Sequence, residues 1–202
     1  MQVKQVNMKI EQYESSQDFI GFVNNLCALE NDAATILSKQ LETVQFKKGE
    51  TVLAQGNLCR YVYFINSGLV KTCFESKERT FIMRFFAEGT MFTVLDSYLT
   101  QKPSAYKVEA LENTVVTRIS RTEMDKLCAR FHAMETFFRK LVSMASVNMM
   151  SRIGEILEEQ ATARYENFLK ENPDLVQRIS LGDLASYLGI TQVSLSRIRA
   201  GI

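Results

Sequence analysis

Apolar residues recur with two different periods along the chain, and each change of period marks a boundary between segments. Residues 16–41 have apolar positions at helical spacing, and the polar residues Asn31 and Asp32 interrupt them, which predicts two short helices. Residues 43–121 alternate apolar and polar positions instead, as strands with one buried face do. The helical spacing then returns. A β domain between two helical regions is therefore expected.

Seven short runs rich in β-branched and aromatic residues make up the strand segment. They lie at 43–46, 51–54, 60–65, 69–74, 80–86, 106–111 and 114–119. Turns with Gly49, Gly56, Gly68 and Gly89 separate several of them. Parallel strands would need crossover helices between the runs, and the pattern shows none, so we expect a closed antiparallel barrel or jelly roll.

After the strands, the pattern predicts a short helix at 122–130 and a long helix from about 133 to 160. The apolar face of the long helix is wider than the face of a helix that is buried on only one side. One side is expected to contact the barrel and the other the same helix of a second chain; the alternative buries both sides within one chain. The expected dimer contacts are Phe138, Leu141, Ala145, Met149, Ile153 and Ile156.

Residues 178–202 have the pattern of a helix-turn-helix. The core and turn positions hold small or apolar residues at the required spacing: Leu184, Ala185, Leu188, Gly189, Ile190, Leu195 and Ile198. Ser180 and Thr191 are predicted to cap the two helices. The exposed face of the second helix carries side chains that can contact DNA: Gln192, Ser194, Ser196, Arg197 and Arg199. The alternative is a helical hairpin that packs on a partner protein.

These segments together predict an α+β fold. It consists of N-terminal helices and an antiparallel β jelly roll or barrel, a long dimerisation helix, and a C-terminal helix-turn-helix without a following wing. The sequence Asn172-Pro173-Asp174 ends the helical run before the helix-turn-helix. The expected domains span residues 1–131, 132–160 and 161–202.

Composition and charge restrict the class of protein. Hydrophobic residues make up 46% of the chain and charged residues 23%, as in ordinary soluble globular proteins. The formal net charge is only +1, so DNA binding would depend on a local patch, here Arg178, Arg197 and Arg199 against the single Asp183. The N-terminus lacks a signal-peptide pattern, and no apolar run approaches the ~20 residues that span a bilayer. A cytoplasmic protein without membrane contact is expected.

Few residues are candidates for metal or cofactor chemistry. Cys27, Cys59, Cys73 and Cys128 lie far apart without a CxxC pair, so no metal site and no cofactor are expected. The thiols are interpreted as inert, with a redox switch as the alternative. His132 is interpreted as a residue at the end of a helix. A cupin-type metalloenzyme would need several histidines facing into the barrel, so we expect that the protein is not an enzyme.

A β-barrel, a long dimerising helix and a terminal helix-turn-helix, in this order, resemble the Crp/Fnr superfamily of bacterial transcription regulators over nearly the whole chain. The barrel part of this resemblance rests on residues 46–56 and 61–68. The C-terminal part, residues 183–199, is more specific and looks like the branch common in Bacteroidetes-type bacteria. The resemblance implies a homodimeric regulator with a cyclic-nucleotide-binding-like domain at 1–131. Its expected partners are a near-palindromic operator in double-stranded DNA, RNA polymerase and an unknown small-molecule effector.

The resemblance also implies roles for residues of the recognition helix. Arg197 takes the position from which the family contacts a base edge, and a bidentate bond to guanine discriminates by about 1 to 3 kcal/mol. Val193 stands where an acidic residue is common, so contact with a thymine methyl is expected. Further DNA contacts are expected from Thr191, Gln192, Ser194 and Arg199. The alternative function is a DNA-independent interaction or scaffold protein that has kept the fold.

The cyclic-nucleotide pocket of the family has a Gly-Glu pair for the ribose and an Arg-Ser pair for the phosphate. In this chain Thr93 and Val94 occupy the first slot, and Pro103 precedes Ser104 in the second. Loss of a charge-assisted phosphate contact costs about 1.5 to 3 kcal/mol, so we expect a degenerate effector domain that does not respond to cAMP.

The barrel can instead sense a small anion or an apolar molecule with a polar head. The candidate effector residues are Arg84, Ser104, Tyr106 and Met149. The alternatives are a surface ion pair of Arg84 with Glu88 or Glu109, and a packing role for the methionine.

Overall fold

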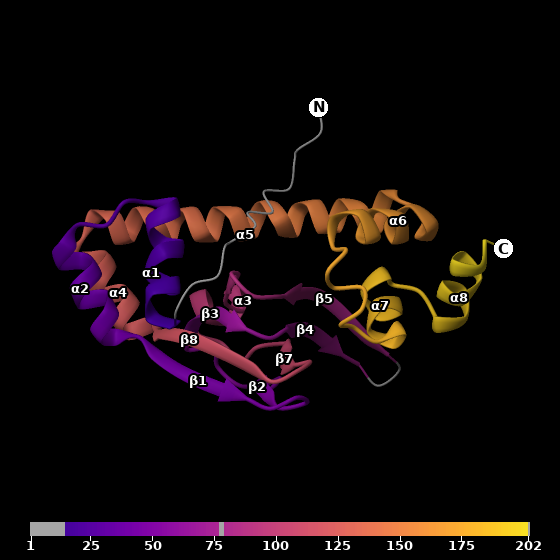
Figure 1. The fold of residues 1–202 in the computed structure, drawn as a ribbon, viewed down its shortest axis with the longest axis horizontal. Helices are drawn as coiled ribbons and strands as arrows, with labels where there is room; N and C mark the ends of the chain where they lie inside the picture. Colours follow the sequence, from indigo (N-terminus) through magenta and orange to yellow (C-terminus); the bar gives the residue numbers. More distant parts are fainter. Residues whose placement is uncertain (1–14, 77–78, 202) are drawn as a thin grey trace.

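Two helices lead into the β domain. They are α1 (Ser15–Leu26) and α2 (Asn31–Gln40), at one end of the molecule in Figure 1. The structure is a computed structural model, and it describes residues 15–76 and 79–201. The helix pair is confirmed, but Asn31 and Asp32 begin α2 and do not interrupt the helices, because polar and acidic residues favour the first turn. The expectation for the extreme N-terminus lies outside the described residues.

The β domain consists of two four-stranded antiparallel sheets. One has the order β1 (Glu42–Phe46), β8 (Thr114–Ser120), β3 (Tyr61–Ser67), β6 (Met91–Phe92), and the other β2 (Thr51–Leu53), β7 (Lys107–Ala110), β4 (Val70–Glu75), β5 (Thr80–Phe86). Every strand pairing is antiparallel. Residues such as Val62, Phe64 and Ile119 fill the core together with Phe19 of α1. The predicted antiparallel jelly roll is confirmed.

Two short elements were not expected from the sequence. Strand β6 has two residues, and helix α3 (Leu95–Thr100) has six. Both are too short to show a period, and the residue before α3, Val94, provides no side-chain cap. Helix α3 lies between β6 and β7, on the segment where the family pocket was expected.

The helical region after the sheets begins with α4 (Arg121–Arg130), which Ser120 caps, and α5 (His132–Glu158), which runs along the molecule in Figure 1. His132 is the first residue of α5, as expected of a helix end. The first half of α5 packs against the β domain through buried Met134, Phe137 and Leu141. Leu141 therefore has little surface left for a second chain, and Phe138 contacts Tyr98 of the same chain. The dimer contact expected at Leu141 is revised because this side chain is buried in its own domain, whereas Phe138 is half-buried and its expected dimer contact stays a prediction.

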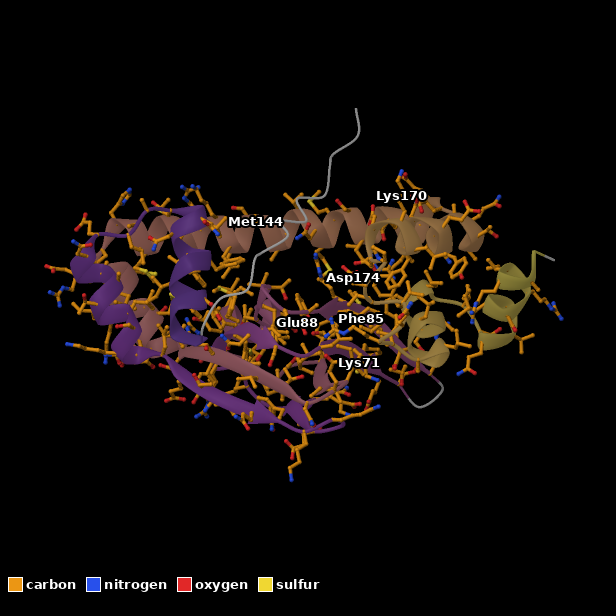
Figure 2. The ribbon with its side chains drawn as sticks, in the orientation of Figure 1. Lys71, Phe85, Glu88, Met144, Lys170 and Asp174 are labelled. Atoms are coloured by element: carbon orange, nitrogen blue, oxygen red, sulfur yellow. The ribbon has the colours of Figure 1, made fainter. Side chains whose placement is uncertain are left out.

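The C-terminal part consists of α6 (Ala161–Glu171), α7 (Leu181–Leu188) and α8 (Gln192–Ala200). It shares an apolar core with the second sheet. Leu69, Cys73, Ile82 and Phe85 of that sheet pack in one cluster with Phe168, Leu175, Ile179, Leu184, Ala185, Leu188 and Leu195. Figure 2 shows Phe85 and Lys71 on the part of the sheet near α7. The helix-turn-helix is therefore docked on its own β domain.

Candidate DNA-binding interface

Local hydrogen bonds set the geometry of the helix-turn-helix. The Ser180 hydroxyl accepts a hydrogen bond from the backbone N–H of Asp183 (3.0 Å), and the Thr191 hydroxyl accepts one from that of Ser194 (3.1 Å). Gly189 ends α7 with φ +70°, in the left-handed region that favours glycine. Both predicted caps and the turn glycine are confirmed.

Helix α8 lies near the C-terminus at one end of the molecule (Figure 1), and only one side of it is covered. Leu195 is buried against α7 in the shared core. The predicted DNA-contacting residues that are exposed are Thr191, Gln192, Val193, Ser196, Arg197 and Arg199, whereas Ser194 is half-buried. The structure thus brings these side chains together on one helix with an open face.

Arg197 and Arg199 supply the positive charge of this face. Neither side chain makes a hydrogen bond or an ion pair with the described residues of the chain, and both residues are exposed. Free guanidinium groups are able to bind a phosphate or the acceptor edge of guanine without breaking an internal contact.

Arg178 does not belong to this basic face. Its guanidinium makes two hydrogen bonds to the Glu88 carboxylate (2.8 and 2.9 Å) and further ones to Glu112. These bonds raise the pKa of Arg178 above its ordinary value. Asp183 is likewise paired, with Lys71 at 2.7 Å. The expected basic patch of three arginines is therefore wrong for Arg178, because the β domain supplies two carboxylates for it.

Gly182 is a contributor to the interface that sequence reasoning missed. A Cβ atom placed on Gly182 would lie 2.6 Å from Nε2 of Gln192. The absent side chain lets the Gln192 amide lie against the start of α7. Only the tertiary structure shows that Gln192 lies this close to Gly182, because the sequence does not indicate what packs against a glycine inside a helix.

The four candidate effector residues do not gather in one pocket. Ser104 is buried, and its hydroxyl bonds with the backbone N–H (2.9 Å) and C=O (3.1 Å) of Tyr106. Tyr106 lines an open groove of about 470 Å³ together with Phe74, Ser76, Arg79, Phe81 and Met83. Arg84 and Met149 do not line this groove, and Met149 is exposed on α5. The alternative interpretation of Arg84, an ion pair with Glu88 or Glu109, is not found among the described residues. Arg178 pairs with Glu88, and Lys71 and Lys107 pair with Glu109.

Side-chain hydrogen bonds join the segment around α3 to backbone groups of neighbouring segments. The Ser97 hydroxyl accepts from the backbone N–H of Cys59 (2.9 Å) and donates to the carbonyl of Lys102 (2.6 Å). The Thr93 hydroxyl donates to the carbonyl of Tyr61 (2.9 Å). Pro103 is exposed and offers no donor. The slots where a nucleotide would meet a carboxylate and a guanidinium thus hold neither group.

The cysteines show no arrangement for metal binding or disulfide formation. All four are free, and no group of three His, Cys, Asp or Glu side chains in the described ranges could hold a metal ion. Burial raises the pKa of the Cys73 thiol. Burial, with the nearby Glu135 and Asp125, raises that of Cys128 to about 12. A raised pKa keeps a thiol protonated and unreactive at neutral pH. Within the described ranges, no helix is apolar enough over sufficient length to cross a membrane.

Comparison with known proteins agrees with this architecture. The family model of the cyclic nucleotide-binding domain matches residues 43–131. The transcriptional regulatory protein btr of Bordetella pertussis is 26% identical over 168 residues, which are 78% of this chain and 69% of that protein. The structure of FixK2 from Bradyrhizobium japonicum is similar with a TM-score of 0.69 and 22% identity, over 80% of this chain and 83% of FixK2. A structure from Eubacterium rectale described as a regulator of the Crp/Fnr family has a TM-score of 0.70 and 18% identity, over 86% and 83% of the two chains. Residues 43–131 therefore match the cyclic nucleotide-binding domain, and the chain has a fold like that of these Crp/Fnr-type structures.

Proposed function

We propose that this protein is a homodimeric, sequence-specific DNA-binding transcription regulator and not an enzyme. The observation that carries the proposal is the open face of α8, where Arg197 and Arg199 have no partner among the described residues. The similarity to the btr regulator and the Crp/Fnr-type fold support it. RNA polymerase is a further proposed partner.

The second half of α5 supports the proposed homodimer. Exposed apolar side chains recur there at intervals of three and four residues, at Val147, Met150, Ile153 and Leu157, with Met149 beside them. Such a row on a helix is the pattern that packs against a second helix. We propose that this row, and not the first half of α5, forms the dimer seam. Of the residues first expected there, Met149 and Ile153 are exposed.

The proposed dimer reads DNA through two copies of α8. Related by a two-fold axis, they would enter successive major grooves about 34 Å apart, so the operator should be a near-palindrome. Arg197 is proposed to read guanine, and Val193, which is exposed, to contact a thymine methyl. Thr191 and the first turn of α8 are proposed to meet the phosphate backbone.

The effector domain is proposed not to respond to cAMP. At the two slots of the family pocket, the chain places Val94, which is buried, and Pro103. Neither side chain can accept a hydrogen bond from a ribose hydroxyl or pair with a phosphate. Titration of the protein with cAMP should give no saturable heat.

Selection of bound sequences from a random duplex library tests the DNA-binding role. We expect the protein to enrich a near-palindrome with half-sites one helical turn apart. Arg197→Ala should lower affinity for the selected site by at least about tenfold, because a bidentate bond to a base is lost. Arg60→Ala, at an exposed position of the β domain, is the matched control and should bind as the unchanged protein does. No enrichment by an intact dimer would favour the DNA-independent interaction protein instead.

A further inference from the structure

Two arginines from different helices bind the C-terminal end of α7. Arg152 of α5 donates a hydrogen bond to the Tyr187 carbonyl, and Nε of Arg164 of α6 donates to the Leu188 carbonyl (3.1 Å). Tyr187 and Leu188 are the last two residues of α7. Carbonyls in the last turn of a helix have no partner within the helix and form the negative end of its dipole, so guanidinium groups suit them. Helices α5 and α6 thus hold the end of α7 that precedes the recognition helix.

Arg152 is the more deeply placed of the two arginines, and it is only 7% exposed. Its guanidinium lies over the Tyr187 ring at 3.8 Å from the centroid, and Nη1 lies 2.9 Å from the Glu155 carboxylate. Nε is buried and has no hydrogen-bond partner in the described part of the chain. A buried cation with an N–H left unpaired is costly, and an apolar side chain would fill the same place without that cost. Stability alone therefore does not account for an arginine at this position.

Tyr187 joins α7 to three other elements. Its ring lies 5.4 Å from that of Phe85 on β5 and 5.1 Å from that of Phe168 on α6, measured between centroids, in addition to its contacts with α5. Nearer the start of α7, Asp183 pairs with Lys71 of β4. The sheet thus anchors the first turn of α7, whereas the last turn is also fixed by α5 and α6. The contact with α5 is the one that relates the helix-turn-helix to the long helix.

Arg152 also lies next to the proposed dimer seam. Its neighbour Ile153 is 48% exposed, and Met150, two positions earlier, is 72% exposed. Successive residues of a helix point about 100° apart, so α5 can present Ile153 to a second chain while Arg152 points to α7. Helix α7 ends at Leu188, and α8 begins at Gln192. One side chain therefore connects the seam to the helix that directly precedes the recognition helix.

We propose that Arg152 is a positioning residue that fixes the direction of α8 relative to the dimer seam, and thereby the spacing of the two DNA half-sites that the dimer accepts. This inference rests on the proposed function, because it requires a homodimer that binds DNA through α8. Arg152 is buried and lies outside α8, so it should govern the spacing of the half-sites and not their sequence. Arg164 supports the same end of α7, since it also donates to the Glu159 carbonyl at the break between α5 and α6.

Operators of different spacing test this role. The selected near-palindrome is compared with duplexes that have one base pair inserted or removed between the half-sites, and Kd is measured for the full chain by fluorescence anisotropy. The test variant combines Arg152→Met with Glu155→Gln, so that the substitution leaves no carboxylate without its cation. Glu155→Gln alone is the matched control, because Arg152 keeps its contacts with Tyr187 there.

The unchanged protein and the control should lose affinity by about tenfold or more at the altered spacings, because one base pair turns a half-site by about 35°. The test variant should lose about threefold or less, since α8 is free to adopt other directions. Arg164→Met, which removes the other donor to the end of α7, is a second variant and should weaken the spacing preference in the same way. Circular dichroism and sedimentation establish that each variant is folded and dimeric.

A role of Arg152 in stability alone would lower affinity by the same factor at every spacing, and an unchanged ratio in the test variant would overturn the proposal. A weakened preference in Glu155→Gln would also overturn it. Amide hydrogen exchange without DNA gives an independent readout: exchange at the end of α7 and in residues 189–191 should be faster in the test variant than in the control. Equal exchange beside a selected operator would overturn only the positioning role. If the unchanged protein selects no operator, the proposed function fails and the spacing role fails with it.

Discussion

The ammonium group of Lys71 on β4 lies 2.7 Å from the carboxylate of Asp183 on α7. These residues are 112 positions apart in the sequence, and their ion pair joins the β domain to the first helix of the helix-turn-helix. Both side chains are mostly buried, with 14% and 19% of their surface exposed. The Glu109 carboxylate lies 3.7 Å from the same ammonium group. The pair therefore anchors α7 on the sheet together with the apolar cluster around Phe85.

Replacing the cation of this pair should loosen the docking of α7. We expect Lys71→Met to lower the free energy of unfolding by about 1 to 3 kcal/mol, because the mostly buried Asp183 carboxylate loses its cation and keeps only the hydrogen bond from the Ser180 hydroxyl. Amide hydrogen exchange in α7 should quicken. Lys107→Met is the control, since Lys107 pairs with Glu109 and Glu75 within the sheet and does not reach α7. Equal exchange in α7 for both variants would contradict the anchoring role.

The Lys71–Asp183 pair also predicts that the free energy of unfolding depends on pH in the alkaline range. Burial alone would lower the pKa of Lys71, but the hydrogen bond and charge of Asp183 and the charge of Glu109 outweigh it, so the pKa is raised above 10.5. A raised pKa in the folded state means that the stabilisation is complete below 10.5 and is lost as pH rises through the folded value. The difference in unfolding free energy between the unchanged protein and Lys71→Met should be constant from pH 6 to 9. It should shrink above about 10.5.

The contact of Glu88 with Arg178 predicts a small loss of stability at acidic pH. Burial would raise the pKa of Glu88, but hydrogen bonds from Arg178 and from backbone N–H groups outweigh it, so the pKa is lowered from 4.5. Stability from this carboxylate is present above 4.5 and is lost as pH falls through the folded value. The Glu88 side chain is 41% exposed, so solvent screening limits the effect to about 1 kcal/mol or less. Tm measured from pH 7 to 3 should converge for the unchanged protein and Glu88→Gln, and a constant gap would argue against this linkage.

Charges placed on the exposed row of α5 should separate the proposed dimer. Met150 and Leu157 are 72% and 77% exposed in the single chain, so Met150→Glu with Leu157→Glu should leave the fold of each chain intact. Sedimentation should then show monomers, with an unchanged circular dichroism spectrum. Ser151→Glu adds a charge about 100° around the helix from Met150 and serves as the control that remains dimeric. A double variant that still sediments as a dimer would place the seam elsewhere.

The thiol of Cys128 should react slowly despite its partial exposure. With a pKa of about 12, roughly one molecule in ten thousand carries the thiolate at pH 8. Alkylation by iodoacetamide at pH 8, followed by mass spectrometry of peptides, should therefore modify Cys128 far more slowly than a free cysteine peptide. Glu135→Gln removes a charge that raises this pKa, so it should increase the rate. Modification of Cys128 at the rate of the free peptide would support the redox switch instead.

Local sequence patterns predicted the elements that have a clear period or a clear cap. The strands, the helix-turn-helix, its Gly189 turn and its Ser180 and Thr191 caps were all predictable, because each depends on residues a few positions apart. The two-residue strand β6 and the six-residue helix α3 were not, since neither is long enough to show a period. Of the expected DNA-contacting residues, all but Ser194 are exposed, and they cover a broad arc of α8 because only the side of Leu195 is buried.

The partners of charged residues were decided by the tertiary structure. From its sequence neighbours, Arg178 looked like part of a basic patch, yet two carboxylates of the β domain hold it. Arg84 lacked the surface ion pair that its neighbours suggested, because Glu88 and Glu109 are taken by residues from other elements. Leu141 had the same apolar character as Met150, but only the first of them is covered by the chain's own core.

The sequence by itself thus determined the order of the elements, the class of the fold and the exposed side of α8, because short-range periodicity and caps encode these features. Only the tertiary structure decided that the helix-turn-helix is docked on the sheet and which half of α5 stays uncovered. Burial and charge pairing depend on which distant segments meet in space, and the pattern of a single chain does not contain that information.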